Sequence, residues 1–329
     1  MRSFTAAEDA WLLEHASIIK DRKELADAFA QEHGHEKSRD ALRRRLNRLK
    51  KNGSLHLLPR KEAAAAFNNV EADRQVAIVL SDIHHGSRVL DQGGKEIYNS
   101  SICESRIRSI PEKTLAIAAP GEHKAALVLL VGDIVDGEGV YPSHGAHLEQ
   151  SVCDQVADSR AALWYALTEL CGIYGAVRVC CVVGNHGRAN KVIDERSNWD
   201  IMLYQQLQLQ ASISDSRIAV DIGYRDGAIF EHMGHKLYLR HIGIKGDATP
   251  SNRGKLGSWL EQYNWDLLVC GHWHMPGLLS YNGRPVLRNG AVQPVTDYGE
   301  RLGYHDTSKQ FVFSMSRNRV IEWLSWVKW

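Results

Sequence analysis

The 329-residue sequence has no long apolar run, few cysteines and no excess of either charge. Its longest apolar stretches, such as 125–131, are far shorter than the roughly 20 residues that span a bilayer, so we expect a soluble protein without a membrane partner. The 6 cysteines form no CxxC pair and no ordered spacing. This argues against a disulfide framework or structural zinc site and favours a reducing compartment. No secretory leader follows Met1, and we expect a cytoplasmic location.

The charge balance is close to neutral. Lys+Arg number 40 and Asp+Glu number 39, for a formal net charge of +1, which taken alone argues against a nucleic-acid partner. The sum hides an uneven distribution. Residues 1–62 hold 14 Lys+Arg and 10 Asp+Glu, a net charge of +4, and the remaining residues hold 26 and 29, a net charge of −3.

The chain divides by pattern into a small and a large part. Residues 1–52 predict a unit of three helices, because apolar residues recur with helical spacing until Asn52 and Gly53 end the last helix. Residues 53–74 predict a linker. Residues 75–329 predict a larger domain in which short β-rich runs alternate with helical stretches, as in a layered α/β (α+β) fold.

Five apolar runs in the larger domain predict strands. They are Val76–Leu80, Leu127–Val131, Val177–Val183, Leu237–Arg240 and Leu267–Cys270. Helices are expected at about 148–173 and 253–263, and residues 310–329 alternate enough for one or two strands.

Each of these five runs is followed by side chains that bind metals or carry protons. In chain order they are Asp82 and His84, Asp133 and Asp136, Asn185 and His186, His241, and His272 and His274. Ligand sites of open α/β sheets gather at the carboxyl ends of strands, and imidazole and carboxylate groups bind Zn, Mn and Fe. In a strand-like stretch, the D-x-H and H-x-H spacings would place both side chains on one face. The pattern therefore predicts a site for two metal ions.

The ordered set of motifs also resembles a known superfamily. Asp82-x-His84, Gly132-Asp133-x-x-Asp136, Gly184-Asn185-His186, His241 and Gly271-His272-x-His274 are similar to the motifs of calcineurin-like metallophosphoesterases, over about residues 75–290. The resemblance implies a four-layer αββα sandwich with a dinuclear metal site. It further implies the distribution of ligands: Asp82, His84 and His274 on one ion, Asn185, His241 and His272 on the other, and Asp133 between them.

The same resemblance implies a reaction. Two cations lower the pKa of a bridging water, so that hydroxide attacks phosphorus in line near neutral pH. His186 would protonate the leaving alkoxide and Asp136 would orient His186. Arg188 is either a contact to a phosphate oxygen or a solvated loop arginine. Mn²⁺ is the expected metal, with Zn²⁺ and Fe as alternatives, since these ligands tolerate all three.

Two positions depart from the pattern of relatives. Many carry an acidic residue directly after the Gly-Asn-His motif, where this sequence has Gly187, so that support for His186 has to come from another residue. Protein Ser/Thr phosphatases of the superfamily carry Arg directly after the second Asp of Gly-Asp-x-x-Asp. Gly137 stands there in this sequence, which disfavours a protein phosphatase.

The third predicted helix, from Ser38, is strongly basic. Residues 37–51 carry a net charge of +7. With the Phe4-Thr5-x-x-Glu8-Asp9-x-Trp11-Leu12 pattern, this helix resembles that of Myb/SANT-like or helix-turn-helix modules, often appended to phage and bacterial nucleases. The candidate nucleic-acid contacts are Arg39, Arg43, Arg44, Arg45, Arg48, Lys50 and Lys51. The alternative is a basic face that docks on the enzyme domain or mediates oligomerisation.

We therefore expect a dinuclear-metal phosphoesterase that hydrolyses phosphodiester bonds, a DNA nuclease similar to the SbcD-type repair exonucleases. Nucleases of this kind are often dimers, and the sequence is compatible with a homodimer. One alternative is a phosphatase, or a small-molecule or cyclic-nucleotide phosphodiesterase, whose N-terminal unit serves as a tether. The other is a non-catalytic DNA-binding protein, which the intact ligand set disfavours. The sequence leaves open DNA or RNA, and endonuclease or exonuclease action.

Overall fold

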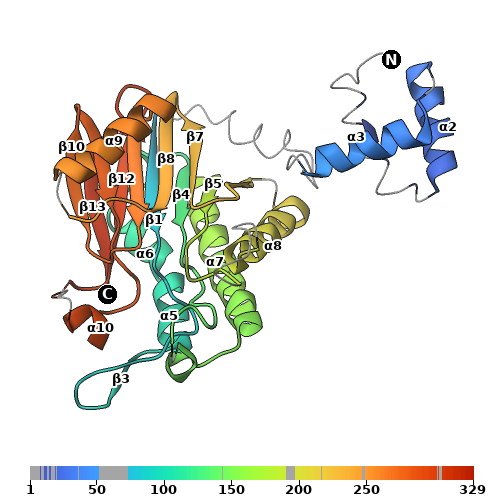
Figure 1. The fold of residues 1–329 in the computed structure, drawn as a ribbon. Helices are drawn as coiled ribbons and strands as arrows, with labels where there is room; N and C mark the ends of the chain where they lie inside the picture. The colour runs from blue at the N-terminus through green and yellow to red at the C-terminus, as the bar shows by residue number, and fades with distance from the viewer. Residues whose placement is uncertain are drawn as a thin grey trace. The chain divides into compact units, whose positions relative to one another are not determined.

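A computed structural model describes most of the chain and divides it into two compact units, Met1–Lys61 and Glu62–Trp329 (Figure 1). The described residues are 8, 11–12, 15, 19, 21–35, 37–51, 73–142, 144–189, 197–215, 217–246, 249–301, 303 and 306–329. Most of the predicted linker lies outside them, so its bounds stay a prediction. In the described part of the chain, no helix is long and apolar enough to cross a membrane.

The larger unit contains a six-stranded sheet in the order β13-β12-β1-β4-β5-β6. The strands are β1 (Arg74–Leu80), β4 (Ala126–Val131), β5 (Val177–Val182), β6 (Ile218–Ile222), β12 (Lys309–Ser316) and β13 (Trp323–Lys328). β1, β4, β5 and β6 run parallel, and β12 and β13 add an antiparallel edge. The predicted strands at these positions are confirmed, and residues 310–329 supply two strands.

A second, five-stranded sheet has the order β10-β11-β9-β8-β7. Its strands are β7 (Gly227–His232), β8 (His235–Ile242), β9 (Leu267–Gly271), β10 (Gly277–Tyr281) and β11 (Arg284–Arg288). Two antiparallel hairpins, β7–β8 and β10–β11, flank the parallel pairs β8–β9 and β9–β11. β8 and β9 confirm the predicted strands, whereas β6, β7, β10 and β11 had no sequence prediction.

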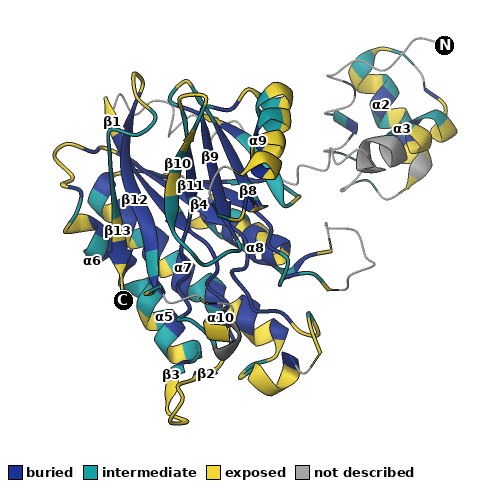
Figure 2. Ribbon diagram, turned by 60° about the vertical axis from the view of Figure 1, so that its left-hand side comes forward, coloured by how far each residue is buried: buried dark blue, intermediate teal, exposed yellow. Residues whose placement is uncertain are grey.

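The side chains of each strand alternate between the two faces of its sheet, and the sheets and helices pack on these faces in four layers. In β1, Val76, Ile78 and Leu80 belong to the core that the first sheet forms with helices, and Ala77 and Val79 belong to the core between the two sheets. The helices on the first sheet are α5 (Ser100–Arg108), α6 (Ile110–Leu115), α7 (Val152–Tyr174) and α8 (Trp199–Ser214). α9 (Pro250–Tyr263) covers the second sheet through Leu256. The predicted αββα sandwich is confirmed, with its central strands buried and its helices exposed on their outer sides (Figure 2).

Local signals explain where the predicted helices begin. The Ser151 side chain accepts a hydrogen bond from the backbone N–H of Asp154 at the start of α7, and Thr249 does the same from Asn252 at the start of α9. Smaller elements connect the layers: the hairpin of β2 (Val89–Leu90) and β3 (Glu96–Tyr98), the 3₁₀ helix η1 (His144–His147) and α10 (Asp297–Arg301).

The smaller unit contains α2 (Arg22–His33) and α3 (Arg39–Lys51), which match the second and third predicted helices. Asp21 caps α2, and Gly34 ends it with a left-handed φ of 68°. The core of the smaller unit consists of Leu12, Leu25, Phe29 and Leu42. Of the first predicted helix, the structure describes Glu8, Trp11, Leu12 and His15 as helical. Phe4, Thr5 and Asp9 of the Myb-like pattern lie outside the described residues.

Candidate metal and catalytic site

The loops that follow β1, β4, β5 and β9, together with His241 near the end of β8, bring the sequence-predicted side chains together. Three groups of potential metal ligands have ligand atoms within 4.8 Å of one another. They are Asp82, His84 and His274; Asp133, His241 and His272; and His84, Asp136 and His186. Because these strands come from both sheets, the site lies where the carboxyl ends of the two sheets meet.

The backbone of this site is strained. Five of the predicted ligands adopt left-handed backbone, with φ between 51° and 75°: Asp82, His84, Asp133, His272 and His274. The prediction that the D-x-H and H-x-H motifs are strand-like is therefore wrong, because their side chains converge through left-handed turns beyond the strand ends. Each such residue costs about 1–2 kcal/mol.

Hydrogen bonds hold these turns in place. The backbone N–H of Asp82 donates to the carbonyl of Gly132 at 3.1 Å, and that of His84 donates to the carbonyl of Asp133 at 3.0 Å. The His272 N–H donates to Asp82 Oδ1 at 2.8 Å. The three motifs thus fix one another, although they come from distant parts of the chain.

The first cluster is arranged as a cation site. His84 donates its Nδ1–H to Asp136, which leaves the Nε2 lone pair facing His274 Nε2 at 3.1 Å. His274 Nε2 lies 3.3 Å from Asp82 Oδ1, and the buried Asp82 Oδ2 has no hydrogen-bond partner among the described residues. Gly271 leaves space for this oxygen, since a Cβ there would lie 2.9 Å from it. Converging lone pairs and an orphaned buried carboxylate oxygen are what a bound divalent ion would satisfy.

The second cluster repeats this arrangement. His241 donates its Nδ1–H to the carbonyl of Val131 at 2.7 Å. Its Nε2 therefore points at two oxygens, Asn185 Oδ1 at 3.1 Å and Asp133 Oδ2 at 3.0 Å. His272 completes the group. A neutral Nε2 facing two acceptor oxygens needs either a proton or a cation between them, so these residues fit a metal ion.

Without a cation, protons take that place. Burial opposes the charged form of His241, but the Asp133 charge outweighs it and raises the pKa of His241 to about 9. Burial likewise opposes ionisation of Asp133, whose pKa is nonetheless held well below its usual value by His241 and His186. Burial and the His241 charge lower the pKa of His272 to about 4.

Asp136 and His186 form a separate pair beside the two clusters. His186 Nδ1 lies 2.9 Å from Asp136 Oδ1 and 3.0 Å from the Asp136 carbonyl oxygen. Burial opposes the charged form of His186, but Asp133 and Asp136 raise its pKa to about 9. Burial also opposes ionisation of Asp136, yet hydrogen bonds from His144, His186 and His84 hold its pKa well below the usual value. The contact expected between Asp136 and His186 is therefore present.

Two residues of this region were not predicted from the sequence. His144, in η1, is fully buried and its Nε2 lies 3.0 Å from Asp136 Oδ2. Asp200, in the first turn of α8, accepts hydrogen bonds from the backbone N–H groups of Asp133 and Gly184. Burial and the Asp133 charge raise the pKa of Asp200 to about 6. The Asn198 cap two residues before Asp200 was a signal for α8, whereas His144 lies in no recognisable motif.

A comparison with family models decides the family. The model described as calcineurin-like phosphoesterase matches residues 76–276.

The chain belongs to the calcineurin-like phosphoesterase family. The family match indicates a hydrolase of phosphate esters that binds divalent metals, and the clusters above supply candidate ligands.

Solved structures similar to this phosphoesterase share little sequence with it. A predicted phosphoesterase from Streptococcus pneumoniae TIGR4 is 14% identical with a TM-score of 0.34, over 78% of this chain and 98% of that chain. A novel archaeal phosphodiesterase is 12% identical with a TM-score of 0.39, over 78% and 100%. Vps29 from Entamoeba histolytica, solved in complex with Zn²⁺, is 13% identical with a TM-score of 0.33, over 78% and 98%. No curated protein matches the sequence.

Steric crowding explains why glycine occupies two positions near the site of this phosphoesterase. Gly137 has a φ of 74°, and a Cβ there would collide with the backbone carbonyl of His186. A Cβ at Gly187 would collide with the Asn198 side chain, which caps α8. The loop that carries Asn185 and His186 therefore packs too tightly for a larger residue at either position.

The remaining predicted residue near the phosphoesterase site is Arg188. It is half-buried, and its Nε donates to the carbonyl of Asn185 at 2.9 Å. This bond ties the guanidinium to the loop that carries Asn185, and both interpretations of Arg188 stay predictions.

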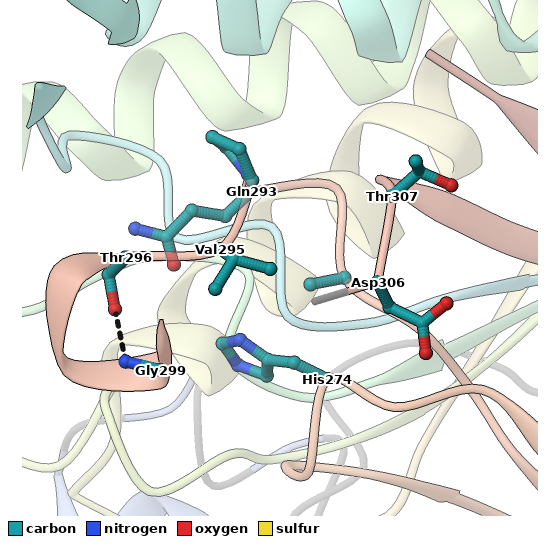
Figure 3. Close-up of a pocket in the computed structure, with 9 residues that line it drawn as sticks. His274, Gln293, Val295, Thr296, Gly299, Asp306 and Thr307 are labelled. Carbon is teal, nitrogen blue, oxygen red and sulfur yellow. Dashed lines mark hydrogen bonds between the residues drawn. The ribbon is translucent and has the colours of Figure 1, made fainter. Parts of the chain in front are cut away.

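A small pocket borders the first cluster. Figure 3 shows the His274 ring on one side of the pocket and the segment from Gln293 to Gly299 on another. Thr296 and Thr307 supply hydroxyl groups, although Thr296 Oγ1 already accepts a hydrogen bond from the Gly299 N–H at 3.2 Å. Ala291, Pro294 and Val295 also line the pocket, so its wall combines polar and apolar groups.

Proposed function

We propose that this protein is a phosphodiesterase that uses two divalent metal ions to cleave DNA. The observation that carries the proposal is the placement of His186, held by Asp136, directly beside two clusters whose lone pairs and carboxylate oxygens converge. A metal-assisted hydrolase needs ligands for the ions, and an acid for a poor leaving group. Both are supplied here by different side chains.

The proposed ligands divide as the two clusters do. Asp82, His84 and His274 would hold one ion, the group of Asn185, His241 and His272 would hold the other, and Asp133 would lie between them. Bound divalent ions supply Lewis acidity, which activates water and offsets charge on phosphoryl oxygens. Mn²⁺ is the proposed metal, because nitrogen and oxygen ligands without thiolate suit it, as they also suit Zn²⁺ and Fe.

His186 is proposed as the general acid. Its Nδ1 donates to Asp136, so its second ring nitrogen, Nε2, carries the transferable proton when the ring is charged. The raised pKa of His186, about 9, follows from the opposing effects of burial and of the Asp133 and Asp136 charges. A sugar alkoxide leaves poorly without protonation, so this arrangement favours an ester of an alcohol, as in DNA, over an aryl ester.

The basic helix α3 supports a nucleic-acid substrate. Its Leu42 is buried in the core of the small unit, and Arg39, Arg43 and Arg44 are exposed. Arg43 makes an exposed ion pair with Asp40 at 3.4 Å, which solvent screens. Arg45 is half-buried and has partners of its own. The side chains of Arg48, Lys50 and Lys51 lie outside the described residues. We propose that the exposed face of α3 contacts the phosphate backbone.

A substrate panel tests the proposed activity. The purified full chain, loaded in turn with Mn²⁺, Zn²⁺ or Fe²⁺, is given linear DNA, RNA, 2′,3′-cyclic AMP, p-nitrophenyl phosphate and bis-p-nitrophenyl phosphate. We expect hydrolysis of DNA and of the bis-ester, and a loss of DNA cleavage of about 10²–10⁴-fold in His186→Gln. Cleavage of the monoester alone would identify a phosphatase, and cleavage of cyclic AMP without DNA would identify a small-molecule phosphodiesterase.

Charge neutralisation tests the proposed DNA contact. Replacing Arg39, Arg43 and Arg44 together by Gln should weaken DNA binding and reduce the slope of log K against log salt by up to about 0.9 for each lost phosphate contact. Lys23→Gln, on the exposed surface of α2, is the matched control. Unchanged affinity and slope in the triple variant would favour a docking or oligomerisation role for α3.

A further inference from the structure

His144 lies behind the catalytic pair and has no place in either metal cluster. Its imidazole is fully buried, and the Tyr141 ring stacks on it with ring centroids 4.3 Å apart and planes inclined by 30°. The ring of His186 meets it edge to face, at 5.7 Å between centroids. A buried imidazole packed between these rings has little freedom to turn.

The backbone determines which nitrogen of His144 carries the proton. The N–H of Val140 donates to His144 Nδ1 at 3.2 Å, so Nδ1 is an acceptor and the hydrogen is on Nε2. That Nε2–H donates to Asp136 Oδ2 at 3.0 Å. His144 is therefore a neutral donor with a fixed direction, set by a backbone group that cannot change its role.

This bond decides how the Asp136 carboxylate is turned. Oδ1 accepts hydrogen bonds from His84 Nδ1 at 2.8 Å and from His186 Nδ1 at 2.9 Å. Oδ2 accepts from His144 alone among the described residues. Without this bond, no described residue would hold Oδ2, and only the two hydrogen bonds to Oδ1 would oppose rotation of the carboxylate about its Cβ–Cγ bond.

We propose that His144 is a positioning residue, which aligns His186 for proton transfer by fixing the orientation of Asp136. The inference rests on the proposed phosphodiesterase function. In the reaction, the oxygen of one water bonds to phosphorus and the bond from phosphorus to the leaving oxygen breaks, with its electron pair remaining on that oxygen. The Nε2 proton of His186 moves to the leaving oxygen, and His186 regains a proton from the solvent, which receives those released by the water.

Two variants that differ by one methylene group test this role. In His144→Gln, the side-chain amide nitrogen can reach the position of Nε2 and donate to Asp136. In His144→Asn the amide nitrogen reaches only the position of Nδ1, so Asp136 loses its donor. His144→Phe serves as a third variant that keeps a ring and removes both nitrogens.

The readout compares two leaving groups on the metal-loaded full chain. Thymidylyl-thymidine has an alkoxide leaving group that needs protonation, and bis-p-nitrophenyl phosphate has a phenolate that does not. We expect the Asn and Phe variants to lose about 10- to 100-fold in kcat on the dinucleotide and less than about threefold on the bis-ester. The Gln variant should stay within about threefold of the natural protein on both substrates.

Metal content and thermal unfolding are measured on every variant, because His84 also donates to Asp136. An equal loss on both substrates, together with lost metal, would assign His144 to the metal site and overturn the proposal. Equal rates in the Asn and Gln variants on the dinucleotide would overturn it as well, whatever the Phe variant does. A natural protein that hydrolyses neither substrate would instead refute the phosphodiesterase function itself.

Discussion

Buried histidines lie beside both ends of the parallel strands, and the charge that surrounds the imidazole differs between the two ends. At the carboxyl ends, His186 and His241 lie among carboxylates. Beside the amino ends of β1 and β5, His232, the last residue of β7, donates its Nε2–H to Gln75 of β1 at 2.8 Å and accepts a hydrogen bond from Arg178 of β5 at 3.2 Å.

The electrostatics of the two ends are opposite, although burial disfavours a charged imidazole at both. Burial and the Arg178 charge lower the pKa of His232 to about 3. At the other end, the charges of Asp133 and Asp136 overcome burial and raise the pKa of His186 to about 9. The neighbouring charge therefore decides whether a buried histidine of this fold is a neutral packing group or a proton donor.

The largest expected effect comes from the carboxyl end. Asp133→Asn removes the carboxylate charge of the second cluster, and we expect kcat on bis-p-nitrophenyl phosphate to fall at least about 10³-fold. Metal content, measured by atomic emission, should fall with it. Asp221→Asn, whose side chain pairs with Arg178 of β5, is the matched control and should keep full activity. A normal rate in Asp133→Asn would remove the functional distinction between the ends.

A smaller effect is expected at the amino end. Arg178 pairs with Asp221 at 2.8 Å and also donates to the carbonyl of Glu231 at 2.6 Å. Arg178→Gln should lower the free energy of unfolding by about 2 kcal/mol, because hydrogen bonds to a charged group are lost. Urea denaturation measures this change, and the hydrolysis rate should stay within about twofold. A tenfold loss of activity would show instead that the two ends are coupled.

The smallest expected effect is on the pH dependence of the free energy of unfolding. The pKa of His232 is lowered in the folded state to about 3 by burial and by Arg178, compared with about 6.5 in an unfolded chain. Between these values unfolding takes up a proton, so the His232 contribution to stability is present above pH 6.5 and is lost as pH falls toward 3.

This contribution changes by at most about 1.4 kcal/mol per pH unit. The difference in unfolding free energy between the natural protein and His232→Gln, measured by urea denaturation at several pH values, should shrink as pH falls from 6.5 to 4. A difference independent of pH would contradict the assignment of His232 as a neutral group in the folded protein.

The sequence predicted the parts of the fold that carry strong local patterns. The apolar runs that became β1, β4, β5, β8 and β9 are buried on both faces, so their composition alone marks them as strands. β10 is half-exposed and holds no continuous apolar run, and α8 follows the motif loop without a clear apolar period. Both were missed because their pairing partners, rather than their own residues, determine their structure.

The candidate site shows the same division. Residue types and their order after the strands predicted the side chains that the structure brings together, because parallel strands of one sheet end at one edge. The sequence did not predict the left-handed backbone of Asp82 or His274, which contacts with distant motifs hold in place. Nor did it predict Asp200, whose role depends on where α8 begins.

By itself, the sequence determined the strands, the ligand set and the contrast between a basic N-terminal segment and a mildly acidic remainder. Each of these depends on the types and order of residues that are close together in the chain. Only the tertiary structure decided which nitrogen of each histidine faces the site and which carboxylate sets its charge. His144 shows why. Its proton position depends on the N–H of Val140, and its partner Asp136 is chosen by the packing of η1 against the site.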